Sequence, residues 1–356
     1  MIFHKTLGEL KNAIDRQIQF FLDLAIEEVK GEDPLMMESL KHVKKIALSG
    51  GKRVRGALLC QSYLGFGGKD KRKIVKAAAA IELIHLFLLI HDDIIDRGRI
   101  RHGQPTLHLM LAKKFQKKLG ESEALHFGNS MAIIVGDMLY AIAIKIISEA
   151  GFEQGATLSA LSKLQSVVNT TIVGQSQDIG ISYKSRVTED EVLSMYENKT
   201  ARYTFEGPLH IGALLAGCSD KKIFELLSEY AINLGIAFQI QDDILGVFSS
   251  EEKTGKSSSS DIEEGKKTLL VIKAQSLAAP DEMIKMNALL GKKSIAKKEL
   301  KSFRDVLIRT GSLEYNKDMA SRRIEVGKRE IEKIIMLPAQ KKFLLGLAEY
   351  LEKREI

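Results

Sequence analysis

Two clusters of aspartates lie inside long apolar segments of this chain, and they limit what the chain can fold into. The first cluster spans residues 91–96 (HDDIID) and the second spans residues 241–246 (QDDILG). An ionised carboxylate is costly to bury in apolar surroundings unless it has a partner. The chain carries a formal net charge of +7, so two acidic clusters in apolar segments are unusual for its composition. They indicate facing carboxylates that share divalent cations.

The apolar residues recur at helical spacing along almost the entire chain. No segment shows convincing strand alternation, and only 5 of the 356 residues are proline. Helices are expected at about residues 5–30, 34–49, 52–65, 71–96, 105–118, 122–149, 154–180, 188–199, 201–217, 219–249, 266–278, 281–291, 295–311, 313–335 and 338–353. The sequence therefore predicts an all-α fold, formed as one domain over residues 1–356 around a central cavity.

Composition and charge argue against several classes of protein. Cys60 and Cys218 provide neither a disulfide framework nor the spacing of a zinc site, which favours a cytoplasmic location. Histidine, aspartate or lysine interrupts each apolar run before it reaches membrane-spanning length, and the first residues lack the apolar core of a signal peptide. We therefore expect a soluble protein without stable membrane insertion. A pI near 9.1 would suit a nucleic-acid-binding protein, but the lysines are scattered among acids and only 6% of the residues are aromatic, so no nucleic acid partner is expected.

The spacing of the first acidic cluster suits a metal site. On a helix, Asp92 and Asp96 lie on one face, one turn apart. Mg²⁺ is usually held by one or two carboxylates together with substrate phosphates, so the cluster predicts Mg²⁺ as a cofactor. His85 lies near the same face two turns earlier, and Arg101 ends a run of arginines that follows the acids. Cations directly beyond a metal-binding pair suit a phosphate bridged to that metal.

A glycine-flanked turn at residues 50–56 (GGKRVRG) carries three more cations. Backbone N–H groups at a helix N-terminus, with Lys and Arg nearby, form an anion site suited to phosphate. The spacing is not that of a Walker motif. Residues 249–265 form the one long polar stretch, and its lysines beside glycine and serine favour an active-site lid over a linker between domains.

Taken in order, these segments resemble the motifs of the trans-isoprenyl diphosphate synthases, the polyprenyl synthases of the farnesyl and geranylgeranyl type. The matching segments are GGK…R from residue 50, ELIH before the first acidic cluster, RHGQP from residue 101, GD at residue 136, GQSQD from residue 174, KT at residue 199, FQIQDD from residue 238 and GK…D…GK from residue 255. The resemblance covers about residues 50–270 and implies the isoprenoid synthase fold, a single large helical bundle around a central active-site cavity. It also implies a homodimer.

The resemblance implies a role for each matching residue. The Mg²⁺ ligands would be Asp92, Asp96 and Asp242, with Asp93 and Asp243 beside them. The allylic diphosphate would be held by Arg101, Lys199, Thr200, Gln239, Lys256 and Lys266. The partner substrate, isopentenyl diphosphate, would be bound by Lys52, Arg55 and His85.

The implied reaction is a head-to-tail condensation that gives an all-trans prenyl diphosphate. The allylic C–O bond ionises, the isopentenyl double bond is alkylated, and a proton leaves to the released diphosphate. Metal and cations would stabilise the departing diphosphate, while Lys199, Thr200 and Gln239 would steady the carbocation. A terpene cyclase needs no isopentenyl site, and a non-catalytic subunit would have lost acids or the Lys199–Thr200 pair, so both alternatives are less well supported.

Two residues depart from the family pattern. His102 stands where the family has the second arginine of a pair; as a substrate-binding residue it could still donate to phosphate, but its charge at neutral pH depends on its surroundings. Gly246 ends the second acidic motif in place of aspartate, which removes one possible metal ligand. The first aspartate of that motif, which would carry the metal, is present.

Product length should depend on residues about one turn before Asp92. The resemblance assigns it to Phe87 and Leu88, and a large aromatic at Phe87 favours a geranylgeranyl (C20) product. A helical wheel instead places Leu88 and Ile84 nearer the Asp92 face, where the bulk of Leu88 would shorten the product to farnesyl (C15). The C20 product is favoured and C15 is the alternative.

Overall fold

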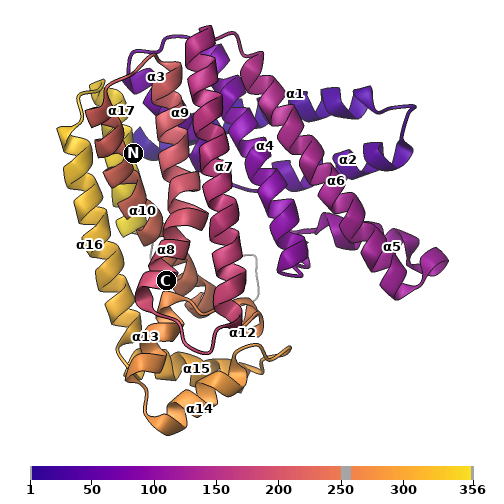
Figure 1. Ribbon diagram of the computed structural model, residues 1–356, viewed down its shortest axis with the longest axis vertical. Coiled ribbons are helices and arrows are strands. Elements are labelled where there is room, and N and C mark those ends of the chain that lie inside the picture. The colour runs from indigo at the N-terminus through magenta and orange to yellow at the C-terminus, as the bar shows by residue number, and fades with distance from the viewer. Residues whose placement is uncertain (1, 250–257, 354–356) are drawn as a thin grey trace. The chain divides into compact units, whose positions relative to one another are not determined.

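The computed structural model describes residues 2–249 and 258–353, and nearly all of them are helical (Figure 1). The all-α prediction is confirmed. The chain divides into two compact units, one made of residues 1–161 with 212–217 and the other of residues 162–211 with 218–356. The expectation of a single domain over residues 1–356 stays a prediction.

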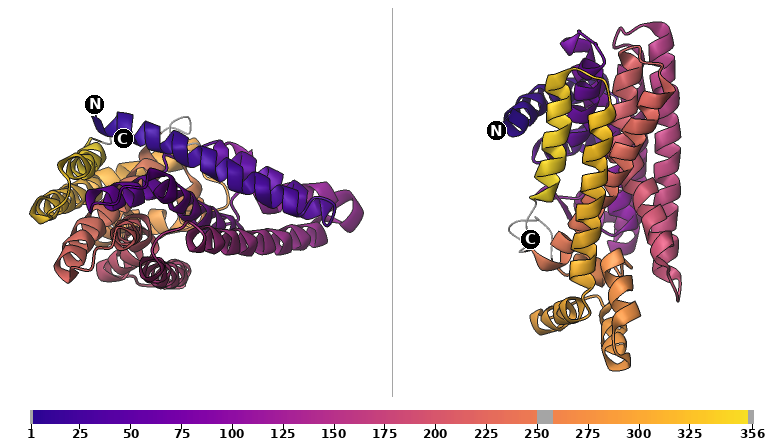
Figure 2. Two further views of the ribbon diagram at one scale, coloured as in Figure 1. Left: turned by 90° about the horizontal axis from the view of Figure 1, so that it is seen from above. Right: turned by 90° about the vertical axis from the view of Figure 1, so that its left-hand side faces the viewer.

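The first unit is built on the long helix that carries the first acidic cluster. Its elements are α1 (Ile2–Glu28), α2 (Pro34–Leu48), α3 (Val54–Gly65), α4 (Lys71–Ile95), β1 (Ile100–Arg101), β2 (Gln104–Pro105), α5 (Leu107–Leu119), α6 (Glu121–Ser148) and the start of α7 (Gln154–Tyr183). Helix α4 packs against α6, α3 and α1, and α5 packs against α6. Helix α1 can be followed in indigo in both views of Figure 2.

The second unit is built on the helix that carries the second acidic cluster. After α7 come α8 (Glu189–Tyr196), η1 (Glu197–Glu206), α9 (Gly207–Leu215), α10 (Lys221–Phe248), α12 (Ser260–Glu263), α13 (Leu269–Leu277), α14 (Pro280–Leu289), α15 (Lys297–Arg309), α16 (Ser312–Lys333) and α17 (Pro338–Glu352). The last residues of α9, from residue 212, belong to the first unit. Helix α10 packs against α16 and η1. Helices α16 and α17 lie side by side, in yellow on the right of Figure 2.

Helix starts follow the capping chemistry of the sequence. The Asp33 side chain accepts hydrogen bonds from the Leu35 and Met36 amides at the start of α2, and Pro34 occupies the first helical position. Asp220 caps α10 in the same way through the Lys222 amide. The long helices expected at 71–96, 122–149 and 219–249 are confirmed within about two residues.

Three local features differ from the expectations. The helix expected to begin at residue 201 begins at Gly207, because a ten-residue π-helix, η1, precedes it. Residues 100–105 form a short antiparallel hairpin, and the helix expected from residue 105 begins at Leu107. Inside the expected polar loop, residues 260–263 form the helix α12. The rest of that loop from residue 250 to residue 257, which includes Lys256, lies outside the described residues.

Length and hydropathy alone would allow three of the described helices, α4, α6 and α10, to cross a membrane, so the expectation that charges rule this out for every apolar run is wrong. The protein itself buries 67% of the most apolar part of α4, against 39% for α6 and 44% for α10. The apolar surface of α4 is therefore explained mainly by packing within the unit, and that of α6 is not.

Candidate active site

The candidate residues fall into two groups, one in each unit. In the first unit, the basic turn before α3 contains a cation, Arg53, with a structural role. The Arg53 side chain is buried, donates to Asp15 at 2.6 Å and to the Ala47 carbonyl, and lies 3.7 Å from Glu82. Its backbone is left-handed, with φ at 55°. Lys52 is exposed beside it. Arg53 therefore fixes the turn that presents Lys52 and Arg55.

The two histidines of this group are both predominantly neutral near pH 7. Burial, with the charges of Arg55 and Arg101, holds the pKa of His85 well below its usual value. Partial burial, with the charge of Arg101, also lowers the pKa of His102, although its Nδ1 lies 3.2 Å from the Ile46 carbonyl oxygen. His102 therefore does not replace the charge of the family's arginine.

The structure brings His102 to the basic turn. A Cβ atom on Gly50 would lie 2.8 Å from the Cγ atom of the His102 ring, so only glycine allows this approach. The hairpin of β1 and β2, which was not expected, turns at His102 and Gly103 and places the ring there. The glycine of the GGK motif thus has a packing role that the sequence alone did not indicate.

The first acidic cluster ends α4. The Asp96 amide donates to the Asp92 carbonyl at 2.8 Å, so the helical turn continues to the last aspartate and the two residues lie one turn apart as expected. Asp93 points elsewhere: its side chain is buried and accepts from Arg101 Nε at 3.1 Å. Arg101 Nη2 also lies 3.9 Å from Asp92. Arg101 and the acids of this cluster are therefore in direct contact.

The residues expected to set product length lie on α4 just before these acids. The Phe87 ring packs edge-on against His91 and tilted against Tyr140 of α6, with ring centroids 4.7 and 5.4 Å apart. Ile84 is fully buried and Leu88 is partly exposed. Phe87 thus faces α6.

In the second unit, Lys199 and Thr200 lie on the π-helix η1. π-Helical turns are rare and often occur at functional sites. Lys199 Nζ lies 2.5 Å from Asp178 of α7. Two glycines bring the neighbouring helices close to this turn: a Cβ atom on Gly174 would stand 2.6 Å from the Lys199 Cα atom, and one on Gly235 would collide with Ala201. The backbone of η1 is therefore fitted closely between α7 and α10.

The second acidic cluster is joined to η1 by hydrogen bonds. Thr200 Oγ1 donates to Gln239 Oε1 at 2.8 Å, and Gln239 Nε2 donates to Asp243 Oδ1 at 2.8 Å. Burial raises the pKa of the Asp243 carboxyl to about 8, which the hydrogen bonds from Tyr196 and Gln239 oppose and the Asp261 and Asp242 carboxylates reinforce. A cation at this cluster would favour the ionised form.

The missing third aspartate of this cluster has a structural counterpart. A Cβ atom on Gly246 would lie 2.6 Å from Asp261 Oδ2, so the Asp261 carboxylate occupies the space beside this glycine. Lys266 lies 2.7 Å from Glu264 and 3.8 Å from Asp261. The glycine that departs from the family pattern therefore accommodates an acid supplied by the following segment.

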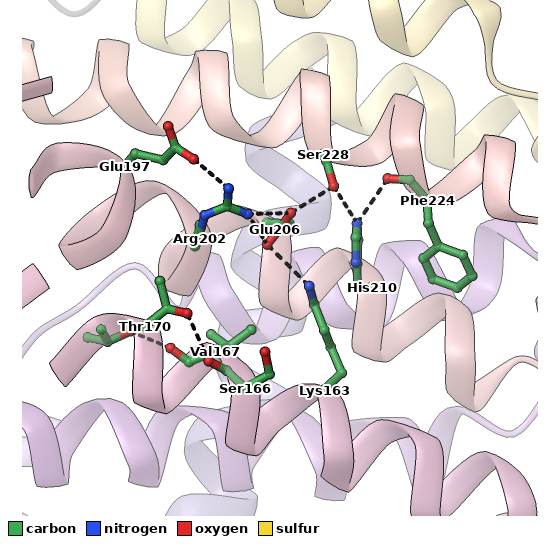
Figure 3. Close-up of polar contacts among 11 residues, drawn as sticks. Lys163, Ser166, Val167, Thr170, Glu197, Arg202, Glu206, His210, Phe224 and Ser228 are labelled. Carbon is green, nitrogen blue, oxygen red and sulfur yellow. Dashed lines mark hydrogen bonds and ion pairs between the residues drawn. The ribbon is translucent and has the colours of Figure 1, made fainter. Parts of the chain in front are cut away.

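A buried ionic network holds the far end of η1 (Figure 3). The Glu206 carboxylate lies 3.2 Å from Lys163 of α7, 3.1 Å from Arg202, and accepts from Ser228 of α10 at 2.7 Å. His210 Nε2 lies 3.1 Å from the Ser228 hydroxyl. Sequence reasoning missed this network, because nothing in the spacing of these residues indicates that they meet.

The donor set fits Mg²⁺. Among residues 2–249 and 258–353, no group of three or more His, Cys, Asp or Glu side chains could hold a metal ion unaided. The acids instead occur in small sets near the end of α4 and within α10, and Asp92 and Asp96 lie one turn apart. Mg²⁺ is typically bound by one or two carboxylates and completed by water and substrate phosphates.

The chain is similar to known proteins along nearly its whole length. Residues 37–307 match the family model described as polyprenyl synthetase. The chain is 36% identical over 357 residues to the geranylgeranyl diphosphate synthase of Methanosarcina mazei, covering 100% of both chains. It is 31% identical to the geranylfarnesyl diphosphate synthase of Aeropyrum pernix, covering 96% of this chain and 99% of the relative. The crystal structure of geranylgeranyl pyrophosphate synthase from Corynebacterium glutamicum, complexed with isoprenyl diphosphate and magnesium, has a TM-score of 0.92 at 28% identity and covers 98% of this chain and 99% of that chain.

Proposed function

Because this chain belongs to the polyprenyl synthetase family and is a trans-prenyltransferase that elongates prenyl chains, we propose that its reaction depends on Mg²⁺ and yields chiefly a C20 diphosphate. The relative from Methanosarcina mazei, which matches along its whole length, is named for the geranylgeranyl product. The relative named for the longer geranylfarnesyl product is less similar. The farnesyl product is the alternative.

The observation that carries the proposal is the set of contacts around η1 and the second acidic cluster. Thr200, Gln239 and Asp243 form one hydrogen-bonded series, and Lys199 precedes Thr200 in the chain. Such a series orients donors and an acid before substrate arrives, which is the requirement for electrostatic catalysis. Lys199 and the second amide N–H of Gln239 would donate to the allylic diphosphate as its C–O bond ionises, while Thr200 would hold Gln239 in place.

Asp92, Asp96 and Asp242 would hold Mg²⁺. Bound Mg²⁺ would neutralise charge on the departing diphosphate and so favour ionisation. Arg101 and Lys266 would bind the same diphosphate directly, and both are held by neighbouring acids. Lys256 is proposed for the same role from its place in the motif alone.

Lys52, Arg55 and His85 would bind isopentenyl diphosphate. Arg53 fixes the turn that carries Lys52 and Arg55 through its buried contacts with Asp15 and Glu82. Because the pKa of His85 is held well below its usual value, this side chain would donate a neutral hydrogen bond to the diphosphate. The two basic residues would supply the positive charge.

We propose that the protein is a homodimer and works in the cytoplasm. Helix α6 is apolar, yet only 39% of its most apolar part is buried in the chain. Ile133 and Ile134 are 45% and 50% exposed on it, which suits burial against a second copy. Both cysteines are free, as a reducing compartment would keep them.

The experiment that tests this function supplies labelled isopentenyl diphosphate and Mg²⁺ with dimethylallyl, geranyl or farnesyl diphosphate in separate reactions, and sizes the products. Linear C20 diphosphate formed only with Mg²⁺ is the expected result. Cyclic hydrocarbon made from the allylic substrate alone would identify a terpene cyclase instead. No reaction from the purified chain, with activity restored by a second polypeptide, would identify a subunit of a heteromeric synthase.

A further inference from the structure

A buried tyrosine lies directly behind the second acidic cluster. Tyr196 ends α8, and only 1% of its surface is exposed. Its hydroxyl donates to Asp243 Oδ2 and accepts a hydrogen bond from the Leu269 amide at 2.9 Å. Burial and the Asp243 charge raise the pKa of Tyr196 well above its usual value, so the hydroxyl keeps the proton that it donates.

With this hydroxyl, each oxygen of the Asp243 side chain accepts a hydrogen bond. Asp243 Oδ1 accepts from Gln239, and Oδ2 accepts from Tyr196. A continuous series of hydrogen bonds therefore runs from Thr200 through Gln239, Asp243 and Tyr196 to the Leu269 amide. Buried polar groups that form such networks are held in one geometry, because each lost partner leaves a desolvated group behind.

The other end of the series fixes where α13 begins. Leu269 is the first residue of α13, and its amide is one of the N–H groups at a helix start that have no partner within the helix. The local cap, Thr268, serves the Val271 amide instead, at 3.4 Å. Tyr196 therefore supplies the Leu269 partner from a distant helix. Lys266, proposed to bind the allylic diphosphate, lies three residues before Leu269.

We propose that Tyr196 is a positioning residue for the allylic half of the reaction. It would hold the second acidic cluster and the start of α13 at a fixed separation, so that Asp242 and Lys266 act on one diphosphate. The inference rests on the proposed function of these residues, but it adds one that does not touch substrate. Tyr196 acts only through Asp243 and the Leu269 amide.

If Tyr196 only stabilised the fold, its substitution would affect the protein in the same way as substitution of any other buried tyrosine. The chain contains such a tyrosine as a matched control. Tyr230 of α10 is equally buried, and its hydroxyl donates to the Leu344 carbonyl at 2.8 Å. Tyr196→Phe and Tyr230→Phe each remove one buried hydroxyl and leave the ring in place. Both variants should lower the melting temperature, so that loss of stability alone does not distinguish the roles.

The test compares three quantities in the two variants: KM for farnesyl diphosphate, KM for isopentenyl diphosphate, and the calorimetric affinity for inorganic pyrophosphate with Mg²⁺. Tyr196→Phe should weaken pyrophosphate binding and raise the farnesyl diphosphate KM by about tenfold, as loss of one buried hydrogen bond allows. Its isopentenyl diphosphate KM should change less than about twofold, and Tyr230→Phe should leave all three quantities unchanged. Equal effects in the two variants, or a parallel rise of both KM values, would overturn the inference.

A measurement on the unaltered protein keeps the test decisive if Tyr196→Phe does not fold. Hydrogen exchange of the Leu269 amide should slow when Mg²⁺ and pyrophosphate bind together, since binding would tighten the series that ends there. An unchanged exchange rate would contradict the inference. If the unaltered protein does not elongate prenyl chains, the proposed function fails; if it does and Tyr196→Phe binds pyrophosphate normally, only the role of Tyr196 fails.

Discussion

Gly174 of α7 and Lys199 of η1 lie so close that a Cβ atom on Gly174 would stand 2.6 Å from the Lys199 Cα atom. Gly174→Ala should therefore displace the π-helical turn that carries Lys199. Overpacking of this kind destabilises a protein by about 1–3 kcal/mol, and here it should also raise the KM for the allylic diphosphate several-fold. Thermal unfolding and steady-state kinetics measure the two effects.

Gly180 provides the control for that substitution. It lies on the same helix, and a Cβ atom there would meet nothing within 4 Å. Gly180→Ala should therefore raise stability by roughly 0.5–1 kcal/mol and leave the KM values unchanged. Identical behaviour of the two alanine variants would show that the close approach at Lys199 has no consequence.

Arg53 and Lys52 are adjacent in sequence and should respond differently to substitution. Removing one partner of a buried ion pair costs about 3–5 kcal/mol, so Arg53→Met should strongly lower the free energy of unfolding. Lys52→Ala should leave stability unchanged, because this side chain is exposed, and should raise the KM for isopentenyl diphosphate about tenfold or more. A stable Arg53→Met variant would contradict the structural role of Arg53.

Glu206 should be important for stability. Its side chain is 4% exposed and contacts Lys163, Arg202 and Ser228, so Glu206→Gln should lower the free energy of unfolding by about 3 kcal/mol in urea titrations. Glu225→Gln is the matched control. Glu225 is 68% exposed and pairs with Lys222 at 3.5 Å, and such a surface pair contributes at most about 1 kcal/mol.

His210 predicts a pH dependence of stability. Burial, with the nearby Lys163 charge, lowers the pKa of His210 in the folded state. Below about pH 6.5 the unfolded chain therefore binds more protons than the folded one, and the free energy of unfolding falls as the pH falls. Each unit by which the folded pKa is depressed contributes about 1.4 kcal/mol to this loss. Between pH 7 and 5, the free energy of unfolding of a His210→Asn variant should fall less steeply with decreasing pH than that of the unaltered protein. An equal slope in the two proteins would show that His210 does not cause the pH dependence.

Phe87 tests the basis of product length. Phe87→Ala would remove the ring that packs against His91 and Tyr140, and the space opened beside α4 should admit a longer prenyl tail, shifting the product from C20 towards C25. Chromatography of the dephosphorylated products measures the shift. If Phe87→Ala leaves the product length unaltered and Leu88→Ala changes it, product length is instead determined by the residues on the Asp92 face of the helix.

The sequence predicted the features that repeat locally along the chain. The helical spacing of apolar residues predicted the long helices, and the capping residues Asp33 and Asp220 predicted where α2 and α10 begin. The π-helix was missed because one extra residue in a turn leaves the apolar pattern nearly unchanged. Gly50 and Gly174 belong to sequence motifs, but only the structure shows that their missing Cβ atoms allow the close approach of His102 and Lys199.

Contacts between distant segments could not be predicted in this way. Arg53 was indistinguishable from Lys52 and Arg55 until the structure placed Asp15 and Glu82 beside it. The contact of Tyr196 with Asp243 joins residues 47 positions apart, and no local rule pairs them. The resemblance to the family's motifs identified the acids, whereas the residues that hold the acids in place could be identified only from the structure.

The most direct test of Mg²⁺-dependent chain elongation follows label from isopentenyl diphosphate into product with farnesyl diphosphate as primer. The reaction is run on the unaltered protein, on Asp92→Ala and Asp242→Ala, and on Asp281→Ala, whose side chain is 71% exposed and belongs to none of the motifs, as the control. The unaltered protein and the control should form labelled C20 diphosphate with Mg²⁺ and none with a chelator, while the two acid variants fold and stay inactive. Full activity in both acid variants would contradict the proposed metal site and the mechanism built on it.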